Sequence, residues 1–580
     1  MKKLTALAVL LALLVGIVSG CGNILGTSKP ITACVGSEPA SIDPAINYSA
    51  DGGTYLIHAF EGLTKTDKNL NTVAGIAKSW TISKNGLVYT FTLRDDSKWS
   101  DGKPVVASDF VYAWQRALNP ATGSYYSYQL LNIINATEIN SQFLGTDGKP
   151  VKAKVDDKGE FVKDDKGNYI AGANGKYVSA KADGSAIWLG DLGAVAVNAH
   201  TLKITLVAPC TYFLDLAATP IFFPVRKDII DAHPTDWANS PKTYIGDGPY
   251  VLSSWTHSSK MVFKKNTNYY DKNDIVSNEI DFLLMSDTNT IFTAYKSGKL
   301  LVSDNVPTTE IPALLKSGEV KINNSLGTYL YAFNVSKPPF DNEKVRKALN
   351  LVIDRQYICD SVVKAGETPA GAFVPAVIPD VTAGKEFRTV GKNYWNATTA
   401  GNATNIAAAK LLLADAGYPD GKRFPAVELK YGNNSGNKLI AEQIVSDWKK
   451  ELGINVNLAP EEWNAFQSDF GKSNYQIAAN DYVADYVDPM SFLSLFNSTN
   501  GDNFTMWRST QYNALIADAN KSVNIAARMT DLHKAEDILM AQVPIIPIYY
   551  DTDPDLVSKN LVGYVNSPLG YKYFMWASVK

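Results

Sequence analysis

Residues 480–489 bring together the side chains that are best suited to binding a ligand. The stretch is Asn-Asp-Tyr-Val-Ala-Asp-Tyr-Val-Asp-Pro, with three carboxylates and two phenols. An alternating run before it (475–479) predicts a strand, and residues 490–496 after it predict a helix. Binding side chains often lie in such connections on a rigid scaffold. The alternative is a solvated loop with one capping aspartate, which is the interpretation we favour for Asp488.

The chain carries no pattern typical of a hydrolase. No Gly-x-Ser-x-Gly motif surrounds a serine, and no His-Glu-x-x-His pair is present. The five histidines are scattered at positions 58, 200, 233, 257 and 533. No cysteine lies in a Cys-x-x-Cys pair, so a zinc cluster is not expected. We therefore predict no enzyme activity, no catalytic residue, no metal and no cofactor. A secreted peptidase is the alternative from another class of protein.

The N-terminus predicts export and a lipid anchor. Lys2 and Lys3 precede an uncharged apolar run, 4–18, which is typical of a secretory signal and short for a membrane span. The run ends in Val-Ser-Gly-Cys, which resembles a bacterial lipobox, so Cys21 would become the lipid-modified first residue of the mature protein. Two or more acyl chains on this cysteine would hold the protein at a membrane surface. An ordinary secretory signal with a chance cysteine is the alternative.

Length and charge set further limits. The 580 residues are enough for more than one domain. With 55 basic and 58 acidic residues the formal net charge is -3, and no clustered basic excess points to a nucleic-acid partner. Apart from Cys21, the chain has Cys34, Cys210 and Cys359, which allow at most one disulfide.

Strand and helix patterns alternate along the chain, which predicts α/β domains with mixed sheets. Residues 87–94 alternate as a half-buried strand. Ser108 can cap a helix over 109–118, and Tyr112 lies off the apolar face of that helix. An amphipathic helix is predicted over 439–452.

A series of short motifs occurs in order along nearly the whole mature chain. In sequence they are Ser-Glu-Pro-Ala-Ser-Ile-Asp-Pro at 37–44, Phe-Glu-Gly-Leu-Thr at 60–64, Lys-Trp-Ser-Asp-Gly at 98–102, Asp-Phe-Val-Tyr-Ala-Trp-Gln-Arg at 109–116, Gly-Asp-Gly-Pro-Tyr at 246–250, Tyr-Ala-Phe-Asn at 331–334, Ala-Asp-Ala-Gly-Tyr-Pro at 414–419 and Ala-Asp-Tyr at 484–486. Each motif is weak alone. The ordered set resembles the oligopeptide-binding lipoproteins of bacterial ABC importers, which belong to extracellular solute-binding protein family 5.

The resemblance implies a two-lobed α/β clamshell of the periplasmic-binding-protein type, with mixed sheets, a third inserted domain and a ligand held between the lobes. The expected divisions are a signal peptide at 1–20, a tether at 21–29, domain I at 30–54, 191–290 and 548–580, domain II at 55–190, and domain III at 291–547.

The resemblance also implies peptide-binding residues. Asp485 matches the aspartate that pairs with the ammonium group of a peptide. Tyr482 stands where relatives often carry a tryptophan, and Val483 and Ala484 complete this part of the predicted site. No arginine precedes the motif, although some oligopeptide binders place one there for the carboxyl end of the peptide.

Three more residues are predicted to contact the peptide. Trp463 and Tyr112 resemble aromatic residues of the cleft, although Trp463 has core packing beside Phe466 and Phe470 as an equal alternative. Glu38 is expected either to contact the peptide backbone or to cap a turn.

The expected partners follow from the same resemblance. They are an oligopeptide ligand, the permease and ATPase of an ABC importer, and the membrane through the lipid anchor; the protein is expected to be a monomer. A receptor for a signalling peptide and a binder of a non-peptide ligand, such as nickel or haem, on the same fold remain alternatives.

Residues 145–182 depart from the family pattern. Turn sequences such as Asp-Asp-Lys-Gly recur there before short runs with an aromatic or β-branched residue. This spacing predicts a small meander of hairpins. The insertion is either a surface segment without function or a docking surface for a partner.

Overall fold

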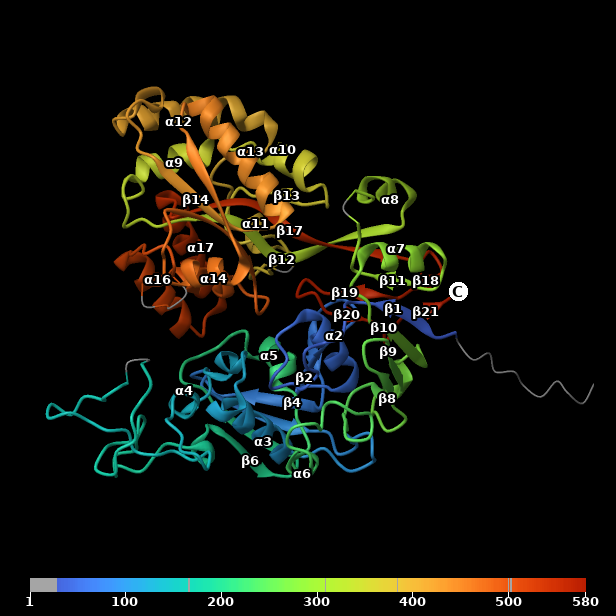
Figure 1. The fold of residues 1–580 in the computed structure, drawn as a ribbon. Coiled ribbons are helices and arrows are strands. Elements are labelled where there is room, and N and C mark those ends of the chain that lie inside the picture. Colours follow the sequence, from blue (N-terminus) through green and yellow to red (C-terminus); the bar gives the residue numbers. More distant parts are fainter. Residues whose placement is uncertain (1–28, 165–166, 308, 383, 499, 501–502) are drawn as a thin grey trace, which may run out of the picture.

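The computed structural model describes residues 29–164, 167–307, 309–382, 384–498, 500 and 503–580, except for the side chains of Ser435, Trp463 and Asn464. The chain folds into two lobes (Figure 1). The predicted signal peptide and Cys21 lie outside the described residues. Among those described, no helix has the length and apolar character needed to cross a membrane.

One large mixed sheet runs through both lobes. Its strand order is β15 (Val456–Glu461), β14 (Val427–Gly432), β16 (Ile477–Val483), β12 (Val320–Phe333), β17 (Ile545–Val557), β11 (Val302–Ser303), β1 (Ile31–Cys34), β10 (Glu279–Leu283), β9 (Lys260–Lys265) and β8 (Tyr250–Thr256), with β13 (Thr368–Pro369) on β17. Parallel pairs, such as β14 with β15 and β1 with β10, stand beside antiparallel ones. The predicted α/β fold with mixed sheets is confirmed.

Strands β12 and β17 connect the lobes. β12 has 14 residues and β17 has 13, and the two strands pair in two separate blocks. Residues 320–324 pair with 552–556, and residues 328–332 pair with 545–550, with a register shift between the two blocks. The extra residues in β12 form a bulge, which bends a strand. The N-terminal lobe consists of the chain before the bulge in β12 together with the last strands of the chain. The C-terminal lobe consists of the chain between the bulge in β12 and the point where β17 returns to the N-terminal lobe.

Helices cover both faces of the sheet in the C-terminal lobe (Figure 1). α9 (Glu343–Leu351), α12 (Asn402–Asp415) and α13 (Ser435–Leu452) contribute to the core on one face. α14 (Trp463–Gly471), α15 (Pro489–Leu493), α16 (Thr510–Lys521) and α17 (Ile525–Gln542) lie on the other. The amphipathic pattern of α13 is confirmed, because Ile440, Ile444, Trp448 and Leu452 are all buried.

The N-terminal lobe contains an antiparallel sheet in the order β4 (Ala77–Ile82), β5 (Val88–Leu93), β7 (Thr201–Thr205) and β6 (Ala194–Asn198). The buried residues of β5 alternate as predicted. The nearby helix α3 spans Ala107–Leu118. The predicted cap at Ser108 is wrong: Val106 holds the N-cap position, and its N–H donates to the Asp109 carboxylate (3.0 Å).

The three-domain division stays a prediction, and the packing favours a different boundary. Helices α7 (Thr288–Lys296) and α8 (Ile311–Ser317) share a small core with Cys34 and Leu556. We therefore infer that the boundary to domain III lies at the bulge of β12 rather than at residue 291.

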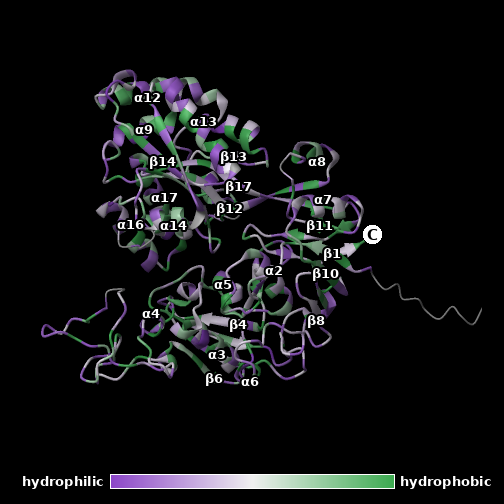
Figure 2. Ribbon diagram, in the orientation of Figure 1, coloured by the Kyte–Doolittle hydropathy of each residue, from purple (hydrophilic) through white to green (hydrophobic). Residues whose placement is uncertain are grey.

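The insertion projects from the N-terminal lobe as a long loop (Figure 1). Single β-bridges, such as Val155 with Phe161 and Lys163 with Tyr169, close its turns. Hydrophilic and hydrophobic residues alternate along it (Figure 2). The predicted hairpin meander thus forms turns, but its bridges do not extend into regular strands in the described part of the insertion.

Candidate functional site

The connection between β16 and α15 is fixed at its C-terminal end. Asp488 caps α15 by accepting the N–H of Met490 (2.8 Å). The Arg528 guanidinium donates to both oxygens of the same carboxylate, at 2.7 and 2.8 Å. Asp488 and Arg528 are buried, so the capping interpretation of Asp488 is confirmed and this residue is a structural support.

The same connection is held at its other end. Ala484 N–H donates to the Leu326 carbonyl (2.7 Å) at the bulge of β12. Asp485 N–H donates to Ser491 Oγ (3.2 Å), and the Tyr482 hydroxyl bonds the Ser491 carbonyl (2.7 Å). These bonds leave the Asp485 side chain half-buried on a fixed backbone.

Tyrosines of the N-terminal lobe face Asp485. Partial burial, followed by the negative charge of Asp485, raises the pKa of Tyr126 and Tyr128. Tyr128 also hydrogen-bonds Asp485. The same carboxylate contributes to raising the pKa of Tyr571, for which burial is the largest cause. A carboxylate ringed by phenols suits an ammonium group, because the rings attract cations and the carboxylate accepts their hydrogen bonds.

Two pockets meet at Asp485, and each is lined from both lobes. One has a volume of about 150 Å³ and includes Asn47, Tyr126, Val483 and Tyr571. The other has a volume of about 400 Å³, and its lining residues include Tyr128, Tyr212, Tyr482, Tyr486 and Ser491. Asp485 thus stands between the lobes, where closure of a clamshell would cover a ligand.

The structure brings four of the predicted residues together. Tyr482, Val483, Ala484 and Asp485 all line pockets at this junction. Tyr482 also lines a third pocket of about 370 Å³ with an apolar wall that includes Phe373, Phe470 and Phe496. Their predicted contacts with a peptide remain predictions.

Glu38 and Tyr112 lie elsewhere. Glu38 accepts the Ser258 N–H (2.7 Å) and pairs with His257 (2.6 Å). Tyr112 stacks under the Lys227 ammonium, 5.4 Å from the ring centre. Neither lines the two pockets at Asp485. The Trp463 side chain is outside the described part of the structure, so its role stays a prediction.

Sequence reasoning missed the tyrosines opposite Asp485. Tyr126 and Tyr128 lie in the run Tyr-Tyr-Ser-Tyr after α3, and this density of phenols was a signal that could have been used. Tyr571 carries no such signal, because it is a single tyrosine near the C-terminus. Its place beside Asp485 depends on the fold alone.

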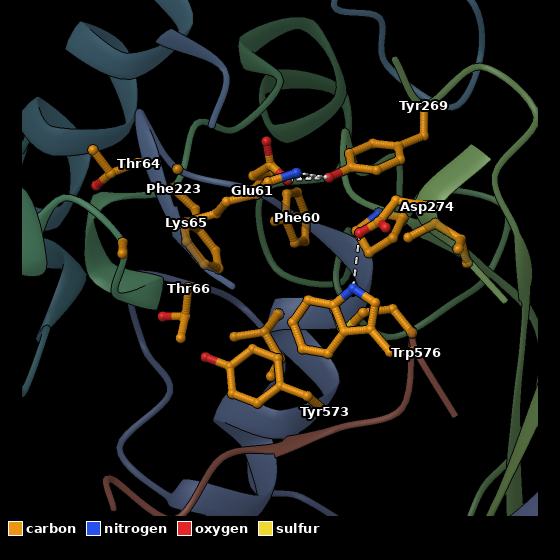
Figure 3. A pocket seen from close by; sticks show the side chains of 16 residues that line it. Phe60, Glu61, Thr64, Lys65, Thr66, Phe223, Tyr269, Asp274, Tyr573 and Trp576 are labelled. Carbon is orange, nitrogen blue, oxygen red and sulfur yellow. Dashed lines mark hydrogen bonds and ion pairs between the residues drawn. The ribbon is translucent and has the colours of Figure 1, made fainter. Parts of the chain in front are cut away.

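A fourth pocket lies within the N-terminal lobe and shares no lining residue with those at Asp485 (Figure 3). It is small, at about 40 Å³. Its buried Glu61 accepts hydrogen bonds from Tyr269 and from Tyr270 (2.6 Å). Burial raises the pKa of Glu61, and the two phenols together with Lys65 oppose this shift. This carboxylate is fully used within the fold.

Neither the cysteines nor the potential metal-binding side chains form a further site in the described part of the chain. Cys34, Cys210 and Cys359 are buried free thiols. Within the described residues, no group of three or more His, Cys, Asp and Glu side chains is placed to hold a metal ion.

Comparison with known proteins decides the family. The model of the bacterial extracellular solute-binding proteins, family 5, matches residues 71–504. This chain belongs to that family. The dipeptide-binding protein DppE of Bacillus subtilis is 32% identical over 544 residues, which cover 93% of this chain and 90% of DppE. The probable deoxycholate-binding periplasmic protein YgiS of Escherichia coli is 30% identical over 542 residues, covering 93% and 91% of the two chains.

Solved structures of similar proteins have the same fold. The unliganded open form of the murein tripeptide-binding protein MppA matches with a TM-score of 0.77 at 31% identity, covering 96% of this chain and 99% of that one. A second structure of MppA, from Escherichia coli, gives 0.70 at 32% identity with the same coverage. The two-lobed periplasmic-binding-protein fold is confirmed.

Proposed function

We propose that this family 5 protein captures extracytoplasmic oligopeptides between its lobes and delivers them to the permease and ATPase of an ABC importer. The observation that carries the proposal is the Asp485 carboxylate, held on a fixed backbone between the lobes and faced by Tyr126, Tyr128 and Tyr571. This arrangement suits the one cation that every unmodified peptide carries, its terminal ammonium.

Strand β16 offers a means of holding a peptide backbone of any sequence. Its whole length pairs with β12, but β14 pairs only with Ile477 and Ala478. Among the described strands, residues 479–483 therefore have a neighbour on one side only. An extended peptide could add to the open side, and its backbone hydrogen bonds would give affinity that does not depend on side chains.

Anchoring and assembly belong to the proposal as well. We propose that Cys21 carries the lipid and holds a monomeric protein at the outer face of the cell membrane. The support is the apolar run that ends in Val-Ser-Gly-Cys. Replacing Cys21 with Ala should release the protein into the medium, whereas a labelled lipid that stays on the variant would contradict this assignment.

Two alternatives remain, and one of them has specific support. A receptor that binds one signalling peptide would use the same pockets. A non-peptide ligand is supported by the likeness to YgiS, because this protein of similar sequence is described as a probable deoxycholate binder.

Native mass spectrometry of the purified protein, followed by release and identification of the ligand, separates these functions. Mixed peptides support an importer, one defined peptide supports a receptor, and a bile acid or other small molecule overturns the peptide proposal.

Titration calorimetry then tests the carboxylate. We expect Asp485→Asn to weaken binding of an unmodified tetra-alanine by about tenfold or more, as for the loss of a hydrogen bond to a charged group. N-acetylation of the peptide should have a similar effect on the wild type. Asp157→Asn, the same change at an exposed residue of the insertion, is the control. Equal affinity for free and acetylated peptide would contradict the role of Asp485.

A further inference from the structure

Several carboxylate side chains lie together on one face of the sheet next to the proposed site. Tyr329 of β12 is the register partner of Asp481 on β16 and of Tyr549 on β17. Because side chains two residues apart on a strand share a face, Gly327 and Asp551 point to the same side. Three adjacent strands therefore present Asp481, Tyr329, Tyr549 and Asp551 together.

Gly327 allows the two aspartates to meet. A Cβ atom at this position would lie 2.0 Å from Oδ2 of Asp551. The missing side chain thus leaves the space through which Asp551 reaches across β12, and its carboxyl group hydrogen-bonds that of Asp481. A third carboxylate, Glu367, precedes β13 at the edge of β17 and adds its charge to the environment of Asp551.

No positive side chain compensates these carboxylates in the described part of the chain. The only charged groups that act on Asp481 and Asp551 there are each other and Glu367. Strand β16 itself, Ile-Ala-Ala-Asn-Asp-Tyr-Val, contains no lysine or arginine. Burial, as the largest cause, raises the pKa of all three carboxyl groups. Asp481 is exposed, but Asp551 and Glu367 are half-buried, and carboxylates removed from water normally have a cationic partner or a metal, so these two lack the group that would stabilise them.

A second observation points to a missing ligand. Oδ2 of Asp551 is buried and has no hydrogen-bond partner among the described residues, and Tyr549, on the same face of the sheet, is only 6% exposed. Its ring lies 5.1 Å from that of Tyr329 in a stacked arrangement. Burial, followed by the negative charges of Asp551, Asp481 and Glu367, raises the pKa of Tyr549, so its hydroxyl is within electrostatic reach of the cluster. The phenol of Tyr329 is used, because it donates to Asn437 (3.1 Å).

The cluster is accessible from the proposed peptide site. Asp481 is exposed and lies in the stretch of β16 whose second edge is open, on the face of the sheet opposite to the apolar wall of the 370 Å³ pocket. It lies four residues before Asp485, a separation of about 13 Å along an extended chain. A peptide that adds to β16 with its ammonium group at Asp485 would bring its third to fifth residue to this level.

We propose that Asp481, Asp551 and Glu367 form a second cation site, which receives the lysine or arginine side chain of a bound peptide and makes this protein selective for basic peptides. The Tyr549 hydroxyl completes the site as a hydrogen-bonding group or as a ring edge beside the cation. The inference rests on the proposed peptide-binding function, and it adds a preference that Asp485 alone cannot give.

Titration calorimetry with a lysine scan tests the proposal. The probes are pentapeptides of alanine with a single lysine at position 2, 3, 4 or 5, each matched by a peptide with norleucine, which has the length of lysine without its charge. Because successive side chains of an extended peptide point to opposite faces, we expect lysine to improve affinity at one position between 3 and 5 and not at the adjacent positions. The expected gain over norleucine is about tenfold or more, as for a hydrogen bond between charged groups.

Two variants locate the effect. Asp481→Asn and Asp551→Asn should each reduce the lysine preference to less than about threefold, while affinity for the norleucine peptide stays the same. Asp157→Asn is the control for the chemical change. Thermal melting of each variant shows whether it is folded.

The outcomes separate this inference from the proposed function. Binding of all pentapeptides without a lysine preference, or a preference that persists in both variants, overturns the cation site and leaves peptide capture intact. Absence of binding by any pentapeptide overturns the proposed function itself. A preference for a free carboxyl terminus over its amide that disappears in Asp481→Asn would also overturn the inference, because the cluster would then hold an anion through a shared proton.

Discussion

Tyr486 lies flat against Tyr212, with ring centres 4.3 Å apart and planes inclined by 5°. The two residues belong to different lobes, and Tyr486 directly follows Asp485. Arg528 approaches Tyr212 at 5.5 Å from its ring centre while it holds Asp488. The loop that presents Asp485 is thereby supported from the N-terminal lobe as well as from α17.

Removal of this stack should weaken ligand binding. An aromatic pair contributes about 0.5–1.5 kcal/mol beyond its buried area, so Tyr486→Ala should lower affinity for tetra-alanine by roughly 3- to 10-fold. Tyr486→Phe keeps the ring and should bind as the wild type does. Titration calorimetry measures both. If Tyr486→Phe loses as much affinity as Tyr486→Ala, the hydroxyl rather than the stack supports the loop.

The buried pair of Asp488 and Arg528 should be costly to break. Replacing Arg528 with Met leaves the carboxylate buried without a cation, and such changes destabilise proteins by about 3–5 kcal/mol. The double variant, with Asp488→Asn added, should recover part of that loss because the uncompensated charge is gone. Denaturant unfolding measures both variants.

An exposed ion pair provides the matched control for this experiment. Lys344 and Asp415 lie 3.3 Å apart, with side chains 50% and 66% exposed. Lys344→Met should change stability little, because water screens such pairs. A loss in Lys344→Met equal to that in Arg528→Met would show that burial does not set the cost.

The insertion can be shortened at a place that the hydrogen bonds define. Ala153 and Lys176 exchange both backbone bonds, at 2.8 and 3.0 Å, so they form a closed antiparallel pair. Replacing residues 154–175 with Asn-Gly would join them through a two-residue hairpin loop.

We expect this deletion to leave stability and peptide affinity unchanged. None of the described residues that it removes lines a pocket at Asp485, and its aromatic contacts, such as Phe161 with Tyr169, are mostly internal. Uptake of peptide by cells should be measured in parallel. Normal affinity with reduced uptake would identify the insertion as a docking surface for a partner.

Patterns in short stretches of the sequence were sufficient to predict helices and strands, but they were not sufficient to predict the candidate binding site. The spacing of Ile440, Ile444 and Trp448 predicts the buried face of α13, because residues four apart in the sequence lie on the same face of a helix. Asp485 and Tyr126 are 359 positions apart in the sequence, and only the packing of the two lobes brings them together. No local pattern contains that contact.

The start of helix α3 is a second feature that could not be predicted from a local sequence pattern. Ser108 is a better N-cap residue than valine by side-chain chemistry, but the Asp109 carboxylate accepts the Val106 N–H and also bonds the Trp99 indole (3.2 Å). A tertiary contact thus moves the start of the helix. The pairing of Asp481 with Asp551 is a further case, because it depends on the register of three strands.

His58 should make the stability of the fold depend on pH. It lies in α2 (Ala50–Ala59), fully buried between the Thr54 carbonyl, which its Nδ1 contacts at 2.6 Å, and the Phe574 N–H, which donates to its Nε2 at 3.2 Å. Both bonds fit the neutral ring with its proton on Nδ1. Burial lowers the pKa of His58 from 6.5 to about 4. A protonated ring would place a second N–H against the N–H of Phe574.

The sign of the effect follows from the lowered pKa. The unfolded chain binds a proton at His58 below pH 6.5, whereas the folded chain resists it until about pH 4. The stability that neutral His58 provides is therefore complete above pH 6.5 and is lost as the pH falls toward 4, by up to about 3 kcal/mol. Urea unfolding of the wild type and of His58→Gln across this range measures the difference. In His58→Gln the fall should be smaller by that amount, whereas His233→Gln, the same change at a histidine whose side chain is 44% exposed, should keep the wild-type profile. Parallel profiles for all three proteins would contradict a neutral buried His58.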